Sequence, residues 1–244
     1  MIGDRDLLEF RQGYYDLFVS LLWKEPAGDL LAALGEGLAE RIGAARDLQP
    51  LLAEGWEEIG RVLADTSEEP LGERVAEEYT SLFIGPPGPE VSLYESAYLT
   101  GRLMDRPLAT VRSFLGEIGI QKQEGFAEPE DFLAFELEIM RRLIARQRSA
   151  GDANEEDRWM GRQADFLKRH LLVWAPAAAC DLESAMSAAF YRGVAKLLRA
   201  FLAFEQELFR GWGPELVPSL QQARQSLAGE GEWKGPLFDI SAPA

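Results

Sequence analysis

The stretch Glu-Tyr-Thr-Ser-Leu-Phe-Ile-Gly-Pro at residues 78–86 contains the end of a helix and the start of a loop that cannot continue it. Val75, Tyr79 and Leu82 recur at helical spacing, so the sequence predicts an amphipathic helix over 71–83. The Gly-Pro pair then stops the helix, because proline locks φ and has no N–H to donate. The stretch therefore predicts the C-terminal end of a helix followed by a rigid loop.

Outside this stretch, helical periodicity is the only strong pattern in the chain. It predicts helices over 4–24, 29–42, 51–63, 71–83 and 108–118, a long helix with Pro129 in its first turn, and helices over 155–174 and 180–209. No alternation of apolar and polar residues persists long enough for a strand. We therefore predict an all-α fold with a single globular multi-helix domain.

Domain boundaries are weak in this sequence. We predict a helical domain over 1–211, with a possible hinge in the polar stretch 149–154. Glycine and proline are frequent over 212–244, which predicts a loosely ordered C-terminal tail.

The loop over 85–93 follows the helix predicted over 71–83 and is rich in proline. After it comes the aromatic segment Tyr-Glu-Ser-Ala-Tyr-Leu at 94–99. A stiff loop holds its neighbouring aromatic side chains in fixed places, as a recognition surface requires. No catalytic motif accompanies it, so the sequence favours binding over chemistry.

The charge is strongly negative, with 25 Lys and Arg against 41 Asp and Glu and a net charge of −16. This excess of acidic residues argues against binding of nucleic acid, because its phosphates require clustered Lys and Arg side chains. It favours cationic partners. The acids before the loop, among them Glu77 and Glu78, are either solvated helix faces or an acidic field able to receive a basic and then apolar peptide. Charge alone does not decide between these two interpretations.

The sequence predicts a cytoplasmic protein without membrane insertion. The first residues carry no basic and apolar signal pattern, and no apolar run is long enough to span a bilayer. The single cysteine fits a reducing compartment.

Most classes of enzyme need residues that this chain lacks. His170 and Cys180 are the only residues of their kinds, and CxxC, HExxH, GxSxG and P-loop motifs are absent. We therefore predict no catalytic residues, no metal site and no cofactor. His170 is interpreted as a structural or surface histidine and Cys180 as a small core residue.

Three blocks of residues in order along the chain resemble the TorD/DmsD/NarJ family of redox-enzyme maturation chaperones. The first is Tyr79-x-x-Leu82-Phe83-Ile84-Gly85-Pro86 followed by 94–99. The second is Glu128-Pro129-Glu130-Asp131-Phe132 followed by 136–140, and the third combines 166–176 with Phe190-Tyr191. The resemblance covers about residues 5–210.

The resemblance implies an all-helical, non-enzymatic chaperone. Members of the family bind the twin-arginine leader of a molybdenum-cofactor oxidoreductase subunit and delay its export until the cofactor is inserted. The implied partners are the apo catalytic subunit and its leader, with the chaperone as a monomer or loose homodimer. The implied leader contacts are Tyr79, Leu82, Phe83, Gly85, Pro86, Tyr94, Ser96, Tyr98 and Asp131, with Glu77 and Glu78 adding electrostatic attraction.

The chain departs from the family pattern at two places. Ser92-Leu93 stands where many members have a Pro-Pro pair, and Phe132 stands where a histidine often follows the acid. The Ser-Leu-Tyr-Glu run at 92–95 is closer to the nitrate-reductase branch. Two other classes stay open at this point: a helical scaffold protein, and an enzyme that binds a small molecule or nucleotide.

Overall fold

The computed structural model describes residues 4–86, 88–123 and 125–229. Within these ranges every regular element is a helix, which confirms the all-α prediction. The elements are α1 (Asp4–Leu22), α2 (Gly28–Gly35), α3 (Leu38–Leu48), α4 (Pro50–Leu63), α5 (Leu71–Phe83), α6 (Glu95–Thr100), α7 (Arg106–Glu117), α8 (Leu133–Arg148), α9 (Ala153–Phe166), the π-helical turn η1 (Leu167–Leu171), α10 (Leu172–Ser184), α11 (Phe190–Leu208) and α12 (Leu220–Gly229). In this part of the chain no helix is both long and apolar enough to cross a membrane.

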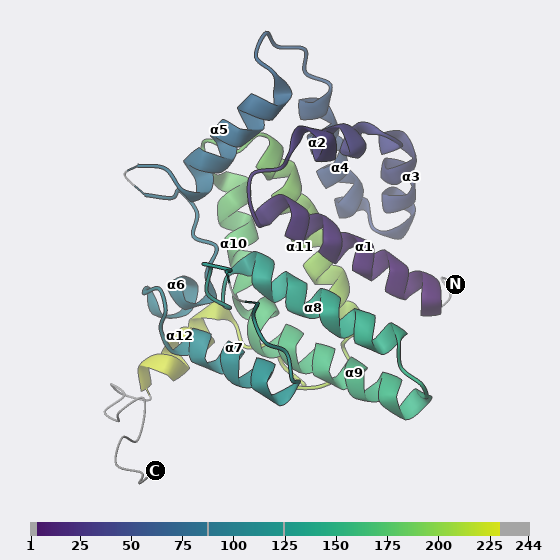
Figure 1. The fold of residues 1–244 in the computed structure, drawn as a ribbon, viewed down its shortest axis with the longest axis vertical. Helices are drawn as coiled ribbons and strands as arrows, with labels where there is room; N and C mark the ends of the chain where they lie inside the picture. The colour runs from purple at the N-terminus through teal and green to yellow at the C-terminus, as the bar shows by residue number, and fades with distance from the viewer. Residues whose placement is uncertain (1–3, 87, 124, 230–244) are drawn as a thin grey trace.

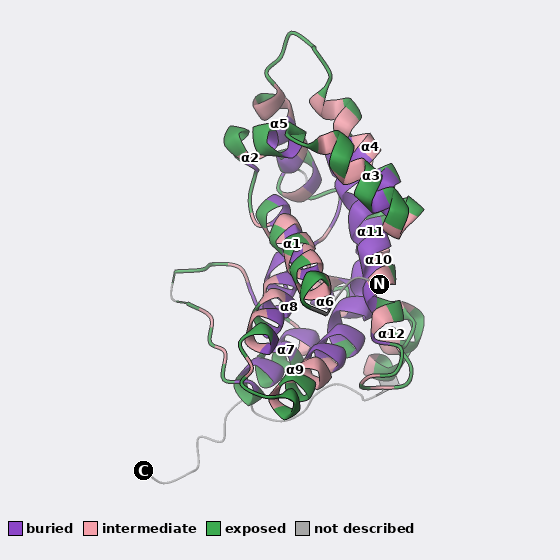
Figure 2. Cartoon of the chain, turned by 90° about the vertical axis from the view of Figure 1, so that its right-hand side faces the viewer, coloured by how far each residue is buried: buried purple, intermediate pink, exposed green. Residues whose placement is uncertain are grey.

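The helices pack around α11. It lies against α4 on one side and α10 on the other, while α1 packs on α8 and α8 on α9 (Figure 1). Figure 2 shows α10 and α11 largely in the buried colour, with α3 and α12 on the outside. One contiguous core therefore runs through the molecule.

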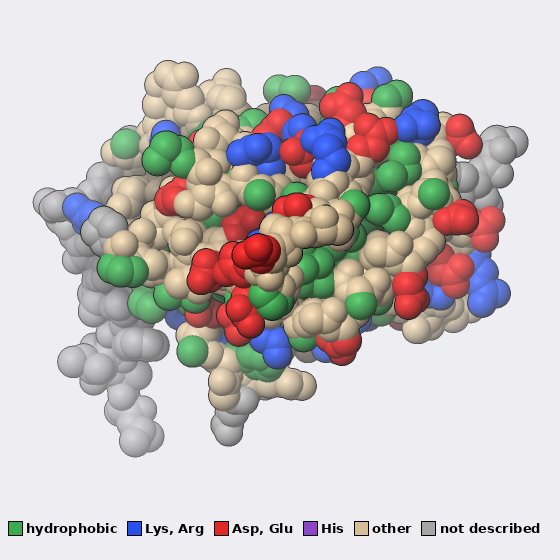
Figure 3. Space-filling view, turned by 90° about the horizontal axis from the view of Figure 1, so that it is seen from above, with side chains coloured by type: hydrophobic (Ala, Val, Ile, Leu, Met, Phe, Trp, Pro, Cys, Tyr) green, Lys and Arg blue, Asp and Glu red, His purple; other side chains and the backbone are tan. Residues whose placement is uncertain are grey.

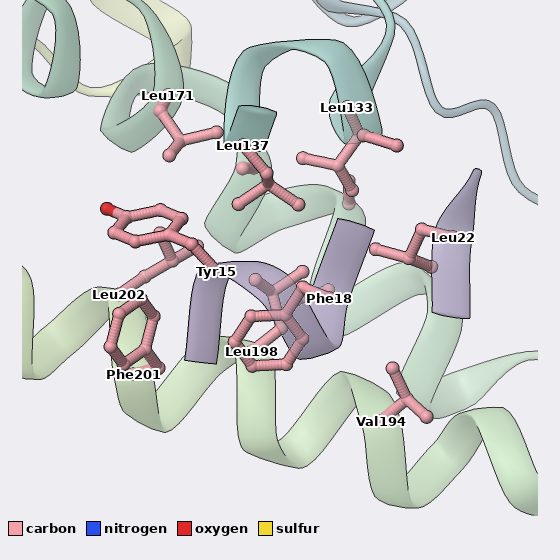
Figure 4. Packing of buried hydrophobic residues seen from close by; sticks show 14 of the residues in the cluster. Tyr15, Phe18, Leu22, Leu133, Leu137, Leu171, Val194, Leu198, Phe201 and Leu202 are labelled. Carbon is pink, nitrogen blue, oxygen red and sulfur yellow. The ribbon is translucent and has the colours of Figure 1, made fainter. Parts of the chain in front are cut away.

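The centre of this core lies where α1, α8 and α11 meet (Figure 4). Phe18 of α1, Leu137 of α8 and Phe201 of α11 have no exposed surface. Each comes from the apolar stripe of its helix, so periodicity in the sequence places it inward. Burying a side chain of this size stabilises the fold by about 1.5–3 kcal/mol.

The helix predicted over 29–42 is wrong as a single element. The chain forms α2 and α3 instead, and Gly37 between them has a φ of +63°. Only glycine adopts this left-handed conformation without strain, so the chain turns there although the apolar period continues.

Pro129 does not lie in the first turn of α8, which begins at Leu133. The backbone before α8 pairs with the segment before α6: the N–H of Glu95 donates to the carbonyl of Asp131 at 2.9 Å, and the N–H of Leu133 donates to Leu93 at 2.8 Å. This pairing keeps the chain extended up to Phe132, and it joins two blocks that the sequence separates by more than 30 residues.

The predicted helices at the C-terminal end also have different limits. The segment predicted over 155–174 continues through η1 to Ser184, and the segment predicted over 180–209 is interrupted before Phe190. Cys180 is exposed on α10 and is not the core residue that we expected.

Part of the predicted tail is helical. Helix α12 packs against α6 and α10, and Arg224 donates to the carbonyl oxygen of Tyr98 at 2.6 Å. The rest of the predicted tail, 230–244, lies outside the described residues. The predicted hinge over 149–154 forms the turn between α8 and α9, where the Asp152 carboxylate caps α9 by accepting from the N–H of Glu155 at 2.9 Å.

Candidate functional site

The end of α5 places its predicted contact residues at different depths. Leu82 is fully buried and Tyr79 is 7% exposed. Phe83 is half-buried and packs edge-on against Tyr79 and Tyr191, with ring centroids at 5.0 and 5.1 Å. Pro86 is exposed. Phe83 and Pro86 therefore lie at the surface, whereas Leu82 belongs to the core.

Gly85 makes the sharp exit from α5. Its N–H donates to the carbonyl of Thr80 at 2.7 Å, and a Cβ at this position would lie 3.2 Å from that same oxygen. The residue is buried, so it shapes the loop and offers little surface to a ligand.

The second group of predicted residues surrounds the start of α6. The hydroxyl of Tyr94 donates to Glu128 at 2.5 Å, and its ring lies 5.4 Å from that of Phe132. Asp131 is fully buried and accepts from the N–H of Ser96 at 3.1 Å. Tyr94 is half-exposed, but Ser96 and Asp131 are interior residues that join the two blocks.

Tyr98 faces a different part of the molecule. Its hydroxyl donates to Asp181 of α10 at 2.8 Å, and its ring packs 5.4 Å from that of Trp174. The predicted residues therefore do not line one groove. The structure divides them into surface residues and residues that hold the surface in place.

Glu78 has a specific structural partner. Its carboxylate accepts from the N–H groups of Ala189, Phe190 and Tyr191 at 2.8, 3.0 and 2.7 Å. Burial raises the pKa of Glu78, and these three hydrogen bonds oppose that shift. The side chain caps the start of α11, where backbone donors lack helical partners.

Glu77 is exposed and belongs to a wider acidic surface. Figure 3 looks down on the end of the molecule from which the loop between α4 and α5 projects, and acidic side chains gather in the middle of this face. The exposed acids of this loop and of α5 are Asp65, Glu68, Glu69, Glu73 and Glu77.

Two carboxylates that the sequence analysis did not select lie beside the tyrosines. Burial, together with the nearby charges of Glu128 and Glu25, raises the pKa of Tyr79 to about 12. Burial and the hydrogen bond to Glu128 raise the pKa of Tyr94 as well. We refer to Tyr79, Tyr94, Glu25 and Glu128 as the aromatic–acidic site. Glu128 stands in the second block of the sequence, whereas no pattern marks Glu25.

A pocket of about 720 Å³ opens next to this site. Trp23, Phe126 and Phe135 line one end of it, and the ring of Trp23 lies 5.1 Å from Phe126 and 6.3 Å from Phe135. Trp23 also lies 6.0 Å from Phe132, which contacts Tyr94. Aromatic contacts thus connect the pocket to the aromatic–acidic site. Phe132 stands in the second block of the sequence, whereas no motif marks Trp23, Phe126 or Phe135 as part of a site.

Behind this surface lies a cluster of buried polar side chains. His170 approaches Glu95 with its Nδ1 atom 3.1 Å from Oε2, and Trp174 donates to Glu136 at 3.1 Å. Burial raises the pKa of Glu136 well above its usual value, and the charges of Glu95 and Asp131 add to the shift. His170 is a buried structural residue, as one of the two interpretations had it. Among the described residues no group of His, Cys, Asp and Glu is arranged to hold a metal ion.

We expect Glu136→Gln to flatten the pH dependence of stability. The raised pKa keeps Glu136 protonated in the folded state at pH values where the unfolded chain ionises it. The folded state then binds more protons, so the free energy of unfolding falls as pH rises above about 4.3, by at most about 1.4 kcal/mol per pH unit for one group. Glutamine cannot ionise, so urea titrations between pH 5 and 8 should show a smaller fall. The exposed Glu117→Gln should keep the parent slope, and an unchanged slope in Glu136→Gln contradicts a protonated Glu136.

The fold and the site define an all-helical protein with a partly aromatic pocket of about 720 Å³ beside carboxylates and tyrosines. The family model described as "Nitrate reductase delta subunit" matches residues 46–179. The chain is 29% identical over 158 residues to the chaperone protein TorD of Aeromonas salmonicida, covering 65% of this chain and 70% of that protein. It is 26% identical over 172 residues to TorD of Vibrio parahaemolyticus, covering 70% and 79%.

The chain also aligns with a crystal structure described as that of a candidate redox enzyme maturation protein from Archaeoglobus fulgidus. The alignment covers 79% of this chain and 93% of the Archaeoglobus chain. The TM-score is 0.45 and the sequence identity is 20%. The family assignment rests on the sequence matches alone. The chain belongs to the TorD/DmsD/NarJ family of redox-enzyme maturation chaperones.

Proposed function

We propose that this protein binds the twin-arginine leader of a molybdenum-cofactor oxidoreductase subunit in the cytoplasm. It holds the apo catalytic subunit back from export while the cofactor is inserted, acting as a monomer or loose homodimer without chemistry of its own. The observation that carries this proposal is the aromatic–acidic site, where Glu128 accepts a hydrogen bond from Tyr94 and both Glu128 and Glu25 lie near Tyr79. Membership of the chaperone family supports the same function.

The chemistry of this site fits a guanidinium group. Arginine forms planar, charge-assisted hydrogen bonds to carboxylates and stacks on aromatic rings. Glu128 is only partly exposed, and such a carboxylate attracts a cation more strongly than a fully hydrated one. An apolar segment that follows the arginines can then pack on the neighbouring aromatic side chains.

The predicted contact residues take two roles in this proposal. Phe83, Pro86 and Tyr94 face the leader, and the buried Tyr79 supports Phe83 from below. Leu82, Gly85, Ser96, Tyr98 and Asp131 hold these side chains in position through burial and hydrogen bonds. Glu77 contributes to the acidic surface that attracts the leader. Glu78 caps the start of α11 and thereby holds α5 against that helix.

We expect Glu128→Gln to weaken binding of a synthetic twin-arginine leader peptide. A hydrogen bond to a charged group contributes about 1.5–3 kcal/mol, so the dissociation constant should rise about ten-fold or more at low salt. The difference should shrink as salt rises, because salt screens the charge of Glu128. Isothermal titration calorimetry at two salt concentrations measures both effects.

The matched control is Glu117→Gln, an exposed carboxylate that pairs with Arg162 and does not line the pocket. This variant should bind the peptide like the parent. Phe83→Ala removes a half-buried aromatic ring beside Tyr79 and should also weaken binding. Parent-like affinity in folded Glu128→Gln and Phe83→Ala would show that the leader binds elsewhere.

A further inference from the structure

Three carboxyl groups and one imidazole are buried together behind the aromatic–acidic site. They belong to Glu95 of α6, Asp131 of the segment before α8, Glu136 of α8 and His170 of η1. None of the four residues is more than 6% exposed. Acids are rarely buried to this degree, because a carboxylate loses its hydration there. We refer to these four residues as the buried acidic cluster.

Two carboxyl groups of the cluster share one proton. Nδ1 of His170 lies 3.1 Å from Oε2 of Glu95, and Trp174 donates to Oε2 of Glu136 at 3.1 Å. Oε1 of Glu136 is buried and receives no hydrogen bond from the described residues, while the side chains of Glu136 and Glu95 are close enough to share one. Two carboxyl groups at this distance do not both ionise. Glu136 therefore carries the proton, and Glu95 accepts it in a hydrogen bond.

The proton is held because its loss would gather negative charge in the interior. The charges that act on Glu136 are those of Glu95 and Asp131. Helix α10 adds only the neutral indole of Trp174, and α1 meets α8 through apolar side chains (Figure 4). Loss of the proton would place three carboxylates together beside one imidazole, that of His170.

Other titratable groups on the elements around the cluster already have partners. These pairs are Lys168 with the carbonyls of Trp212 and Pro214, Arg112 with Glu130, and Tyr98 with Asp181. Apart from His170, the cluster thus has no cation of its own in the part of the chain that the structure describes. A positive charge from outside would favour its ionisation.

The cluster is connected to the aromatic–acidic site through the paired backbone before α6 and α8. Glu95 follows Tyr94 in the chain, and its N–H donates to the carbonyl of Asp131 at 2.9 Å. Burial, the hydrogen bond to Glu128 and the charges of Glu128 and Asp131 raise the pKa of Tyr94. The site and the cluster therefore lie within electrostatic reach of each other. A unit charge about 10 Å away shifts a proton equilibrium about ten-fold at an effective dielectric constant of about 20.

We propose that binding of the leader's arginines at the aromatic–acidic site releases the proton that Glu95 and Glu136 share. A guanidinium at Glu128 stabilises negative charge behind it, so the Glu136 carboxyl ionises and its proton passes to the buffer. By linkage, the same coupling makes leader binding tighter as the pH rises. This inference rests on the proposed function and adds a proton-linked control of affinity to it.

The test counts protons by isothermal titration calorimetry of the full chain at pH 7.5 in two buffers of different ionisation enthalpy. The probe is a synthetic peptide with two adjacent arginines and an apolar stretch, acetylated at its N-terminus, amidated at its C-terminus and free of other ionisable residues. It has no group that titrates between pH 6 and 9. Tyr79 and Tyr94 keep their protons in this range because their pKa values are raised. The difference in heat between the buffers then reports protons released by the protein.

The variants separate the shared proton from other sources. Glu136→Gln keeps a hydrogen-bond donor and acceptor at this position but cannot ionise. Glu136→Met is the second variant, in case the glutamine variant does not fold, because its sulfur still accepts weakly from Trp174. Glu117→Gln, which replaces an exposed carboxylate outside the cluster, is the matched control.

We expect the parent and Glu117→Gln to release a measurable fraction of a proton for each peptide bound. Their dissociation constants should fall between pH 6 and 9, by up to about ten-fold. The folded Glu136 variants should release clearly fewer protons, and their dissociation constants should change less than about two-fold over the same range.

Two outcomes separate the inference from the proposed function. If the parent binds the peptide without proton release, or if the folded Glu136 variants release as many protons as the parent, the proton coupling is wrong while leader binding stands. If the parent does not bind the peptide in either buffer, the proposed function and the inference both fail.

Discussion

Replacing Glu205 by alanine should lower the free energy of unfolding by about 3–5 kcal/mol, because it leaves the buried charge of Arg11 without its partner. Arg11 is 1% exposed and Glu205 is fully buried. The Nε atom of Arg11 lies 2.6 Å from Oε1 of Glu205, and Nη2 lies 2.9 Å from Oε2. This bidentate pair joins α1 to α11.

Further hydrogen bonds extend the effect of this substitution. Tyr15 donates to Glu205 at 2.8 Å, and Arg11 donates to Gln163 of α9 at 2.8 Å. Gln163 in turn donates to Gln147 of α8 at 2.8 Å. Loss of the carboxylate would leave Tyr15 without its acceptor as well as Arg11 without its counter-ion, and buried unpaired donors are costly.

Urea denaturation followed by circular dichroism measures this change. The control is Glu207→Ala, which breaks an exposed pair with Arg210 and should change stability by less than about 1 kcal/mol. A loss of similar size in both variants would mean that the buried pair adds nothing beyond a surface ion pair.

The second large effect is expected at Gly193, where α11 meets α4. A Cβ atom at Gly193 would lie 2.8 Å from the backbone nitrogen of Ile59 and 3.0 Å from the carbonyl oxygen of Gly55. Gly55 is likewise too close to Leu197 to carry a side chain. A Cβ added at Gly55 would lie 2.8 Å from the backbone nitrogen of Leu197. Backbone atoms cannot rotate away, so a side chain at either glycine must separate the two helices.

We expect Gly193→Ala to lower the free energy of unfolding by about 2 kcal/mol, the middle of the range for overpacked cores. Gly193→Val should cost more. Gly43 on α3 is the matched control, because a Cβ there meets no atom within 4 Å. Gly43→Ala should stabilise the protein by about 0.5–1 kcal/mol through helix propensity. Thermal unfolding of the two alanine variants gives the comparison, and equal shifts would contradict the close approach of α4 and α11.

Helix positions were predictable where one apolar stripe decides the outcome. Helix α5 begins and ends where the period and Pro86 predict it, and α7 ends before Gly119, whose φ is +65°. Interruptions between helices were not predictable where the apolar periodicity continues across them. The turn at Gly37 depends on one backbone dihedral, and the start of α8 depends on pairing with the segment before α6.

The candidate site was predictable in its aromatic part only. Tyrosines beside a proline-rich loop indicate a binding surface, and the structure places Tyr94 there. The role of Glu78 was hidden, because its partners are backbone groups more than 100 residues away. Glu25 and Glu128 are also more than 100 residues apart in the sequence, and only the folded chain brings both near Tyr79. Sequence patterns describe single elements and do not report which charges meet between them.

The most direct test of the proposed function is a pull-down with the full chain from the cytoplasm of the native host. Bound proteins are identified by mass at low and at high salt, with Glu128→Gln as a parallel bait. If the proposed function is correct, we expect recovery of a molybdoenzyme precursor that still carries its twin-arginine leader, in smaller amounts at high salt and with the Glu128→Gln bait. Recovery of only mature, leaderless proteins, equally with both baits, would contradict it.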